Sequence, residues 1–340
     1  MNAARTGLAL AVAWLSLAAA AVAAPSAEGM AHWDKAVEAC KAGRFGAALP
    51  ELDAAVQAFP DSAVVLATRG DVHLRMGHFD AALADLDAAV RYAGETKVAA
   101  KPLVQRGGLI MAAQPDAARR DFEHAIALDP DSSGAHYMLA SALMGSDPPR
   151  ALAEVDRSIA LEPTPAIYHQ LRGMLRQDVG DLAGAKADLD LAVERDPKTF
   201  LMWSARASLN LERGDCAAAR EDALQAQALF KNHPLDAVTE ALADVFVDDV
   251  PAAARLLRDV AQRAPEAIAA RSVVSSSTPD AMLARIGRDP ARAPKAQLAW
   301  GLVAAARGEP VLANQHFEQA MAADPRLADS VRFARKSFNL

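Results

Sequence analysis

The sequence predicts an all-α protein, and three observations support that fold class. Alanine is the commonest residue, and aromatic residues make up only 5% of the chain. Alanine has the highest helix propensity, whereas β-branched strand formers are sparse outside short runs such as Val273-Val274. Glycine, alanine and proline also recur at a spacing of about 34 residues, which is typical of repeated helix pairs. We therefore expect closely packed antiparallel helices and no sheet.

The charge balance argues against nucleic acid as a partner. The 340 residues include 36 lysines and arginines and 43 aspartates and glutamates, which gives a formal net charge of -7. A protein that binds the phosphate backbone usually carries an excess of basic residues.

Residues 1–23 have the pattern of a secretory signal peptide. Arg5 precedes an apolar run from Gly7 to Val22, and the run ends in the small residues Ala21-Val22-Ala23. We expect cleavage after Ala23, with residues 24–28 forming a flexible start to the mature chain. An uncleaved anchor is the alternative, because the run is close to the roughly 20 residues that span a bilayer. No later stretch is apolar enough, so we expect a periplasmic or secreted protein without a transmembrane segment.

The repeating unit divides the rest of the chain into consecutive segments. We expect six helix pairs over 29–231, because glycine supplies the turn in each pair and proline ends the second helix. The two copies that match one for one contain Arg69-Gly70, Gly77, Ala82, Leu86 and Ala89, and Arg172-Gly173, Gly180, Ala185, Leu189 and Ala192. The segments that follow are a degenerate pair over 235–265, an irregular linker over 266–293 with a short helix at 279–287, a further repeat over 294–325, and an amphipathic helix over 326–340.

One helix pair cannot bury its apolar face alone, so the copies must stack into a solenoid. The last helix then has to cover the final apolar face. Its apolar residues Leu327, Val331, Phe333, Ala334 and Phe338 suit that role. In such an array Cys40 and Cys216 are separated by several helix pairs. A disulfide needs Cα atoms within about 7 Å, so we expect the two thiols to stay unpaired.

The order of these landmarks resembles the tetratricopeptide repeat family, whose units carry an aromatic residue, a Leu-Gly pair, a later alanine, a second aromatic residue and a closing proline. The resemblance implies a right-handed superhelix whose first helices line a concave groove for a peptide or a partner helix. Equivalent positions in that groove hold Thr68, Asp71, Arg75, Met111, Tyr137, Ser141, Met144, Gln170, Met174, Gln177, Ser204, Ser208 and Leu211. Methionine, tyrosine and small polar residues suit an adaptable groove, although each of them could instead pack between helices.

Opposite charges recur within the repeats at a fixed spacing. Arginine stands where the family has an apolar residue, and an aspartate follows 15 or 16 residues later. We expect an ion pair between the two helices of each repeat, which would leave these arginines little capacity for a ligand. The predicted pairs are Lys35 with Glu51, Arg69 with Asp85, Arg106 with Asp121, Arg172 with Asp188, and Arg206 with Asp222. In the last repeat the same two positions hold Trp300 and His316.

The sequence contains none of the common catalytic motifs. No glycine-rich phosphate loop or nucleophile elbow follows a predicted strand, and the histidines and cysteines form no His-Glu-x-x-His or Cys-x-x-Cys arrangement. We therefore expect no catalytic residue, no metal site and no cofactor.

Two hypotheses on function remain. The favoured one is a noncatalytic scaffold or adaptor of the bacterial cell envelope that binds peptide or protein segments in its groove and can form a homodimer. The alternative is an accessory factor for export or modification of an envelope polysaccharide. Saccharide sites usually expose aromatic platforms and paired carboxylates, which this sequence offers poorly.

Overall fold

The computed structural model describes residues 26–230, 234–265 and 278–340, and in these segments the chain is helical with no strand. The predicted signal peptide and residues 272–277 of the serine-rich stretch lie outside the described residues. The chain divides into two compact units, residues 1–130 and 131–340, which we call the N-terminal and C-terminal units. The all-α prediction is confirmed.

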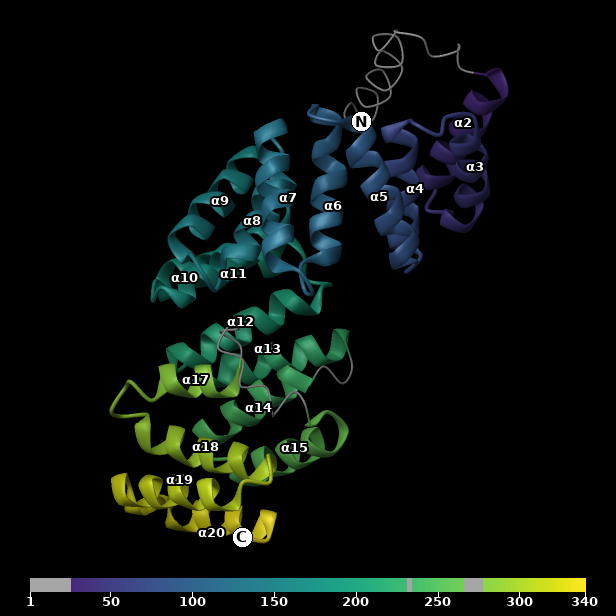
Figure 1. The fold of residues 1–340 in the computed structure, drawn as a ribbon. Helices are drawn as coiled ribbons and strands as arrows, with labels where there is room; N and C mark the ends of the chain where they lie inside the picture. Colours follow the sequence, from purple (N-terminus) through teal and green to yellow (C-terminus); the bar gives the residue numbers. More distant parts are fainter. Residues whose placement is uncertain (1–25, 231–233, 266–277) are drawn as a thin grey trace. The chain divides into compact units, whose positions relative to one another are not determined.

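The N-terminal unit consists of three consecutive helix pairs (Figure 1). Each pair joins two helices of similar length through a short turn, as the spacing of the glycines predicts. The pairs are α2 (Ala27–Lys41) with α3 (Phe45–Ala58), α4 (Ala63–Arg75) with α5 (Phe79–Ala93), and α6 (Ala100–Ile110) with α7 (Pro115–Leu128).

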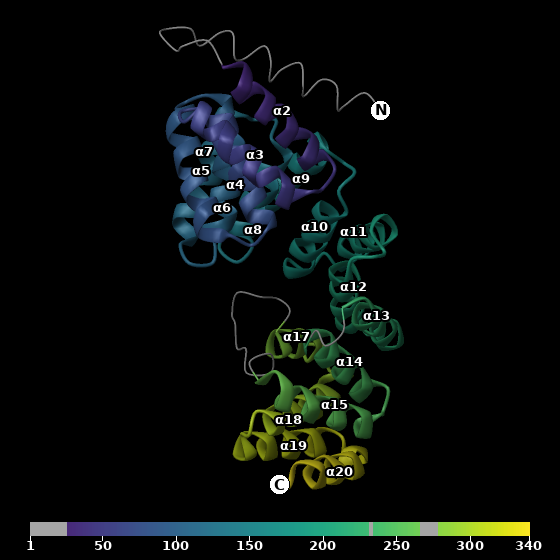
Figure 2. The ribbon, with the colours of Figure 1, turned by 90° about the vertical axis from the view of Figure 1, so that its right-hand side faces the viewer.

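The C-terminal unit continues the same pattern. Four more pairs follow in the order predicted: α8 (Ser133–Leu143) with α9 (Pro148–Leu161), α10 (Ala166–Asp178) with α11 (Leu182–Arg195), α12 (Phe200–Arg213) with α13 (Cys216–Leu229), and α14 (Pro234–Phe246) with α15 (Val250–Arg263). The short helix α17 (Pro279–Ile286) precedes a last pair, α18 (Ala293–Ala306) with α19 (Pro310–Ala323), and the chain closes with α20 (Ala328–Phe338). The view turned by 90° shows α14, α15, α18, α19 and α20 packed together at the end of this unit (Figure 2).

Glycine has two roles in the repeats. Gly77 and Gly180 follow a first helix with φ of +76° and +85°, a conformation that favours glycine in a tight turn. Gly107 instead permits close packing of the two helices, since a Cβ atom there would lie 2.5 Å from a ring carbon of Phe122. Gly173 and Leu189 repeat this contact, with a corresponding separation of 2.7 Å. Both roles follow the landmarks in the sequence.

The largest apolar cluster runs from α12 to α20 within the C-terminal unit. Val331 and Ala334 on α20 are buried in it, and Phe338 packs against it, so α20 covers an apolar face as predicted. Phe333 is an exception because its side chain faces solvent and is 41% exposed. Phe333 therefore adds little to the contacts of α20 with α15, α18 and α19.

Candidate functional site

Four of the predicted ion pairs form, and each is bidentate. In every case the arginine Nε and Nη2 donate to the two carboxylate oxygens of a buried aspartate at 2.7–2.9 Å. The pairs are Arg69 with Asp85, Arg106 with Asp121, Arg172 with Asp188, and Arg206 with Asp222. The aspartate in each pair, through its hydrogen bonds, raises the pKa of its arginine further above the ordinary value.

Each of these arginines also reaches the preceding repeat. Its Nη1 donates at 2.8–3.2 Å to a second, more exposed aspartate on the preceding second helix: Asp53 for Arg69, Asp87 for Arg106, Asp156 for Arg172, and Asp190 for Arg206. We call this series the arginine ladder. The arginines therefore join consecutive repeats and are already engaged by carboxylates, in agreement with their predicted structural role.

The fifth predicted pair is wrong. Among the described residues, Glu51 pairs with His32, whose Nδ1 lies 2.6 Å from a carboxylate oxygen, while Lys35 is exposed. His32 stands one helical turn before Lys35 on α2 and reaches α3 without extending a long flexible side chain across the gap. This hydrogen bond to His32 lowers the pKa of Glu51.

The predicted groove residues of the N-terminal unit lie on α4 and at the end of α6. Asp71 accepts hydrogen bonds from Arg75 at 3.0 Å and from Gln105 on α6 at 2.7 Å. Arg75 is exposed, and its guanidinium lies 5.2 Å from the ring centre of Phe45. Met111 is half-buried beyond the last turn of α6. Asp71 thus joins two successive first helices, and it is only partly available to a ligand.

Five predicted groove residues of the C-terminal unit remain half-buried at the surface, namely Tyr137, Ser141, Met144, Met174 and Ser204. They lie on or beside the first helices α8, α10 and α12. The ring of Tyr137 contacts that of Tyr168 with centroids 5.1 Å apart, which brings α8 and α10 together. Burial raises the pKa of Tyr137. We call the α8 and α10 positions Tyr137, Ser141, Met144 and Met174 the first-helix face.

The other four predicted groove residues of the C-terminal unit are buried, so they offer little surface to a partner. They are Gln170, Gln177, Ser208 and Leu211. Gln170 donates a hydrogen bond to the Met174 sulfur at 3.3 Å, and Gln177 donates one to Glu212 on α12 at 2.7 Å. Ser208 is 8% exposed, and Leu211 is fully buried in the large apolar cluster.

The short helix α17 contributes to the apolar cluster that contains Leu211. Its residues Met282, Leu283 and Ile286 belong to the same apolar cluster, and α17 packs against α12. Arg285 places its Nε 2.7 Å from Glu212 and its Nη1 3.7 Å from Asp178 at the end of α10. The sequence predicts a helix here but gives no sign of where it packs, because none of its residues belongs to the repeat pattern.

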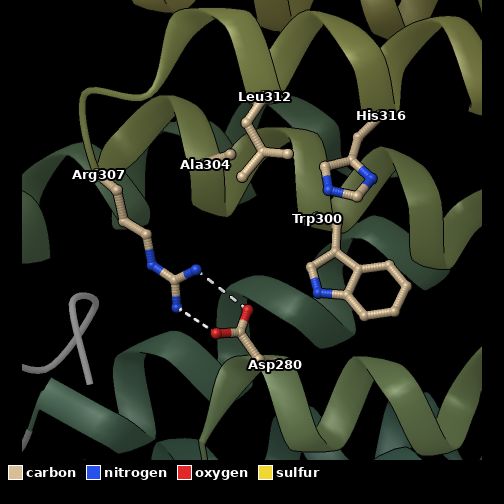
Figure 3. Close-up of a pocket in the computed structure, with 6 residues that line it drawn as sticks. All are labelled: Asp280, Trp300, Ala304, Arg307, Leu312 and His316. Atoms are coloured by element: carbon tan, nitrogen blue, oxygen red, sulfur yellow. Dashed lines mark hydrogen bonds and ion pairs between the residues drawn. The ribbon is translucent and has the colours of Figure 1, made fainter. Parts of the chain in front are cut away.

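A pocket of about 220 Å³ lies between α17 and the last helix pair (Figure 3). Its lining residues are Asp280, Trp300, Ala304, Arg307, Leu312 and His316. Arg307 donates two hydrogen bonds to Asp280 at 2.9 and 3.1 Å, and the rings of Trp300 and His316 stack with centroids 5.5 Å apart. The pocket therefore has one charged wall and one aromatic wall, beneath the apolar side chains of Ala304 and Leu312.

The described segments contain no group of three or more histidine, cysteine or carboxylate side chains that could hold a metal ion. Within the same segments, no helix has the length and apolar character needed to span a bilayer. Cys40 and Cys216 are both free thiols, and burial raises the pKa of each.

Comparison with known proteins identifies the repeats. Family models described as tetratricopeptide repeat match residues 39–105, 112–165 and 171–236. No curated protein matches the sequence. Among solved structures, a tetratricopeptide repeat protein from Parabacteroides merdae has a TM-score of 0.53 at 15% identity, covering 70% of this chain and 93% of that one.

A second solved structure is PilW, titled a type IV pilus biogenesis factor. It has a TM-score of 0.53 at 17% identity and covers 60% of this chain and 94% of its own. PilF of Pseudomonas aeruginosa has a TM-score of 0.51 at 17% identity, with coverage of 60% and 93%. These similarities show a shared fold. Since the family models match more than half of the sequence, the chain belongs to the tetratricopeptide repeat family.

Proposed function

We propose that this protein is a noncatalytic scaffold of the bacterial cell envelope, and that its first-helix face binds a peptide or protein segment. Its membership of the tetratricopeptide repeat family supports a role in protein–protein interaction. The envelope location rests on the signal-peptide pattern of residues 1–23. The fold shared with a pilus biogenesis factor is compatible with that location.

The observation that carries the binding site is the contrast between two parts of the first helices. In the C-terminal part of α12, Ser208 and Leu211 are buried, and α17 packs against the helix. On α8 and α10, by contrast, Tyr137, Met144 and Met174 remain half-buried. Flexible thioether side chains beside an aromatic ring adapt to apolar side chains of different shapes. The face on α8 and α10 is therefore the part of the predicted groove best suited to a partner.

Photo-crosslinking in living cells tests this proposal. A photoreactive residue replaces Met174, and a matched variant carries it at Lys186 on α11, the second helix of the same pair. Irradiation followed by mass spectrometry should give a dominant protein adduct at position 174 that is absent at 186, because only the first position lies on the proposed binding face. The adduct should be an envelope protein.

Other outcomes would contradict the proposal. Identical protein adducts at both positions would show nonspecific contact. Adducts with polysaccharide alone at position 174 would favour the role in envelope polymer export. A fractionation in which the protein remains in the cytoplasm would contradict the envelope location.

A further inference from the structure

The pocket between α17 and the last helix pair lies in a repeat that carries no arginine of the ladder. Trp300 occupies the ladder arginine position and His316 the position of the buried aspartate. Their rings stack at an interplanar angle of 20° in place of a bidentate ion pair. The carboxylate beside them comes from α17 instead, since Asp280 lines the same pocket and binds Arg307.

Earlier repeats show what fills the equivalent space. In three of the four repeats with a ladder arginine, the residue four positions later points to the same aspartate as that arginine does, whereas the Arg106 repeat holds Ile110 there. Arg176 Nη1 donates to Asp188 at 2.8 Å, Asn210 Nδ2 donates to Asp222 at 2.8 Å, and His73 Nε2 lies 3.9 Å from Asp85. The corresponding residue in the last repeat is Ala304, whose methyl group is too short to fill this space.

Asp280 can accept more hydrogen bonds than Arg307 supplies. Its side chain is 34% exposed, and each carboxylate oxygen accepts one bond from Arg307. An ionised carboxylate has about four lone-pair sites, so acceptor capacity remains. The buried Asp188 shows two guanidinium groups on one carboxylate, because it binds both Arg172 and Arg176.

The other lining residues suit a ligand with an aliphatic chain that ends in a planar cation, such as a guanidinium group. Ala304 and Leu312 are apolar, and Trp300 provides the kind of aromatic surface on which guanidinium groups pack. The protein already contains that contact elsewhere, since the Arg206 guanidinium lies 5.1 Å from the ring centre of Trp203. Burial lowers the pKa of His316, which favours the uncharged ring beside the pocket.

We propose that this pocket binds an arginine side chain presented by a partner protein. The guanidinium joins Arg307 on Asp280, and the stem lies along Ala304 and Leu312 beside Trp300. The occupant thus supplies the donor group that Arg176 and Asn210 supply within their own repeats. The protein then has two binding sites for partner proteins, namely this pocket and the first-helix face that contains Met174.

The test is an NMR titration of the purified protein with N-acetyl-arginine amide. The indole N–H signal of Trp300 should shift and saturate at millimolar probe, whereas those of Trp33 and Trp203 should not. N-acetyl-citrulline amide has the same shape without the charge. Its binding should be weaker by about tenfold, the loss expected when one charge-assisted hydrogen bond becomes neutral.

A substitution that fills the pocket with a larger side chain shows whether the probe binds there. Ala304→Asn places at this position the residue that occupies the equivalent place in α12, so the shift of Trp300 should disappear. Ala306→Asn changes a half-buried alanine of α18 that does not line the pocket, and it should retain the response. Thermal unfolding of both variants verifies that they are folded.

Three results would overturn the proposal: no saturable shift of Trp300, equal binding of the citrulline probe, or an unchanged response in Ala304→Asn. None of these depends on crosslinking at Met174. Conversely, a failure of the crosslinking experiment would leave the titration result intact, so the two proposals can fail separately.

Discussion

At the scale of single residues, the ladder arginines bind two kinds of carboxylate. The aspartate of the same repeat is buried, as with Asp188, whose side chain is 4% exposed. The aspartate of the preceding repeat is much more accessible, as with Asp156 at 55%. Breaking a buried ion pair leaves an uncompensated charge, whereas an exposed pair contributes little because water and salt screen it.

We therefore expect the two aspartates bound by Arg172 to differ in their contribution to stability. Asp188→Ala should lower the free energy of unfolding by about 3 kcal/mol, because Arg172 and Arg176 both lose a buried acceptor. Asp156→Ala should cost less than about 1 kcal/mol. Urea denaturation followed by circular dichroism measures both values, and equal losses would contradict the distinction.

At the scale of a helix, α14 buries acidic side chains. Asp244 is completely buried, and its carboxylate lies 2.8 Å from the Nε of Arg220 on α13. Burial raises the pKa of Asp244 to about 6, although Arg220 opposes the shift. The packing of α14 therefore penalises the ionised form of this carboxylate relative to the same group in the unfolded chain.

This burial predicts a pH dependence with a definite sign. The unfolded chain has an aspartate pKa of about 4, so the folded protein holds the proton more tightly between pH 4 and 6. Stability from this group is greatest below that range and falls as the pH rises through 6. Asp244→Asn removes the ionisation, so its stability relative to the unmodified protein should rise by about 2 kcal/mol between pH 4.5 and 7.5.

Urea denaturation at the two pH values measures that difference. The control is Asp329→Asn on α20, where the side chain is 90% exposed and the same substitution should give no comparable change. A stability difference for Asp244→Asn that is independent of pH would show that Asp244 titrates normally.

At the scale of the whole molecule, each repeat is stabilised mainly by packing against its neighbours. The apolar face of a terminal repeat therefore has to be covered by another element. α20 covers that face in the C-terminal unit by packing on α15 and α18, and Arg258 of α15 also donates to the Ser337 carbonyl oxygen at 3.0 Å. Val331 is 1% exposed at this contact, whereas Phe333 on the same helix faces solvent.

Substitutions on α20 should therefore act locally. Val331→Ser should cost about 2 kcal/mol, because it removes buried apolar atoms and buries a hydroxyl. Phe333→Ser should stay within about 0.5 kcal/mol. Hydrogen exchange should accelerate in α15 and α18 of Val331→Ser but not in α10 and α11. Uniform acceleration throughout the unit would show that it unfolds as one cooperative block.

Local spacing in the sequence determined most of the fold. The positions of Gly77 and Gly180 and the pairing of Arg172 with Asp188 follow from it, because they depend on residues in one helix pair or one turn. Tertiary structure decided where α17 lies, and with it the ion pairs of Arg285 with Glu212 and Asp178. A short helix outside the repeat pattern can pack on several apolar faces, and no periodicity selects one of them. The pocket beside Ala304 likewise depends on Asp280, which α17 brings to the last repeat.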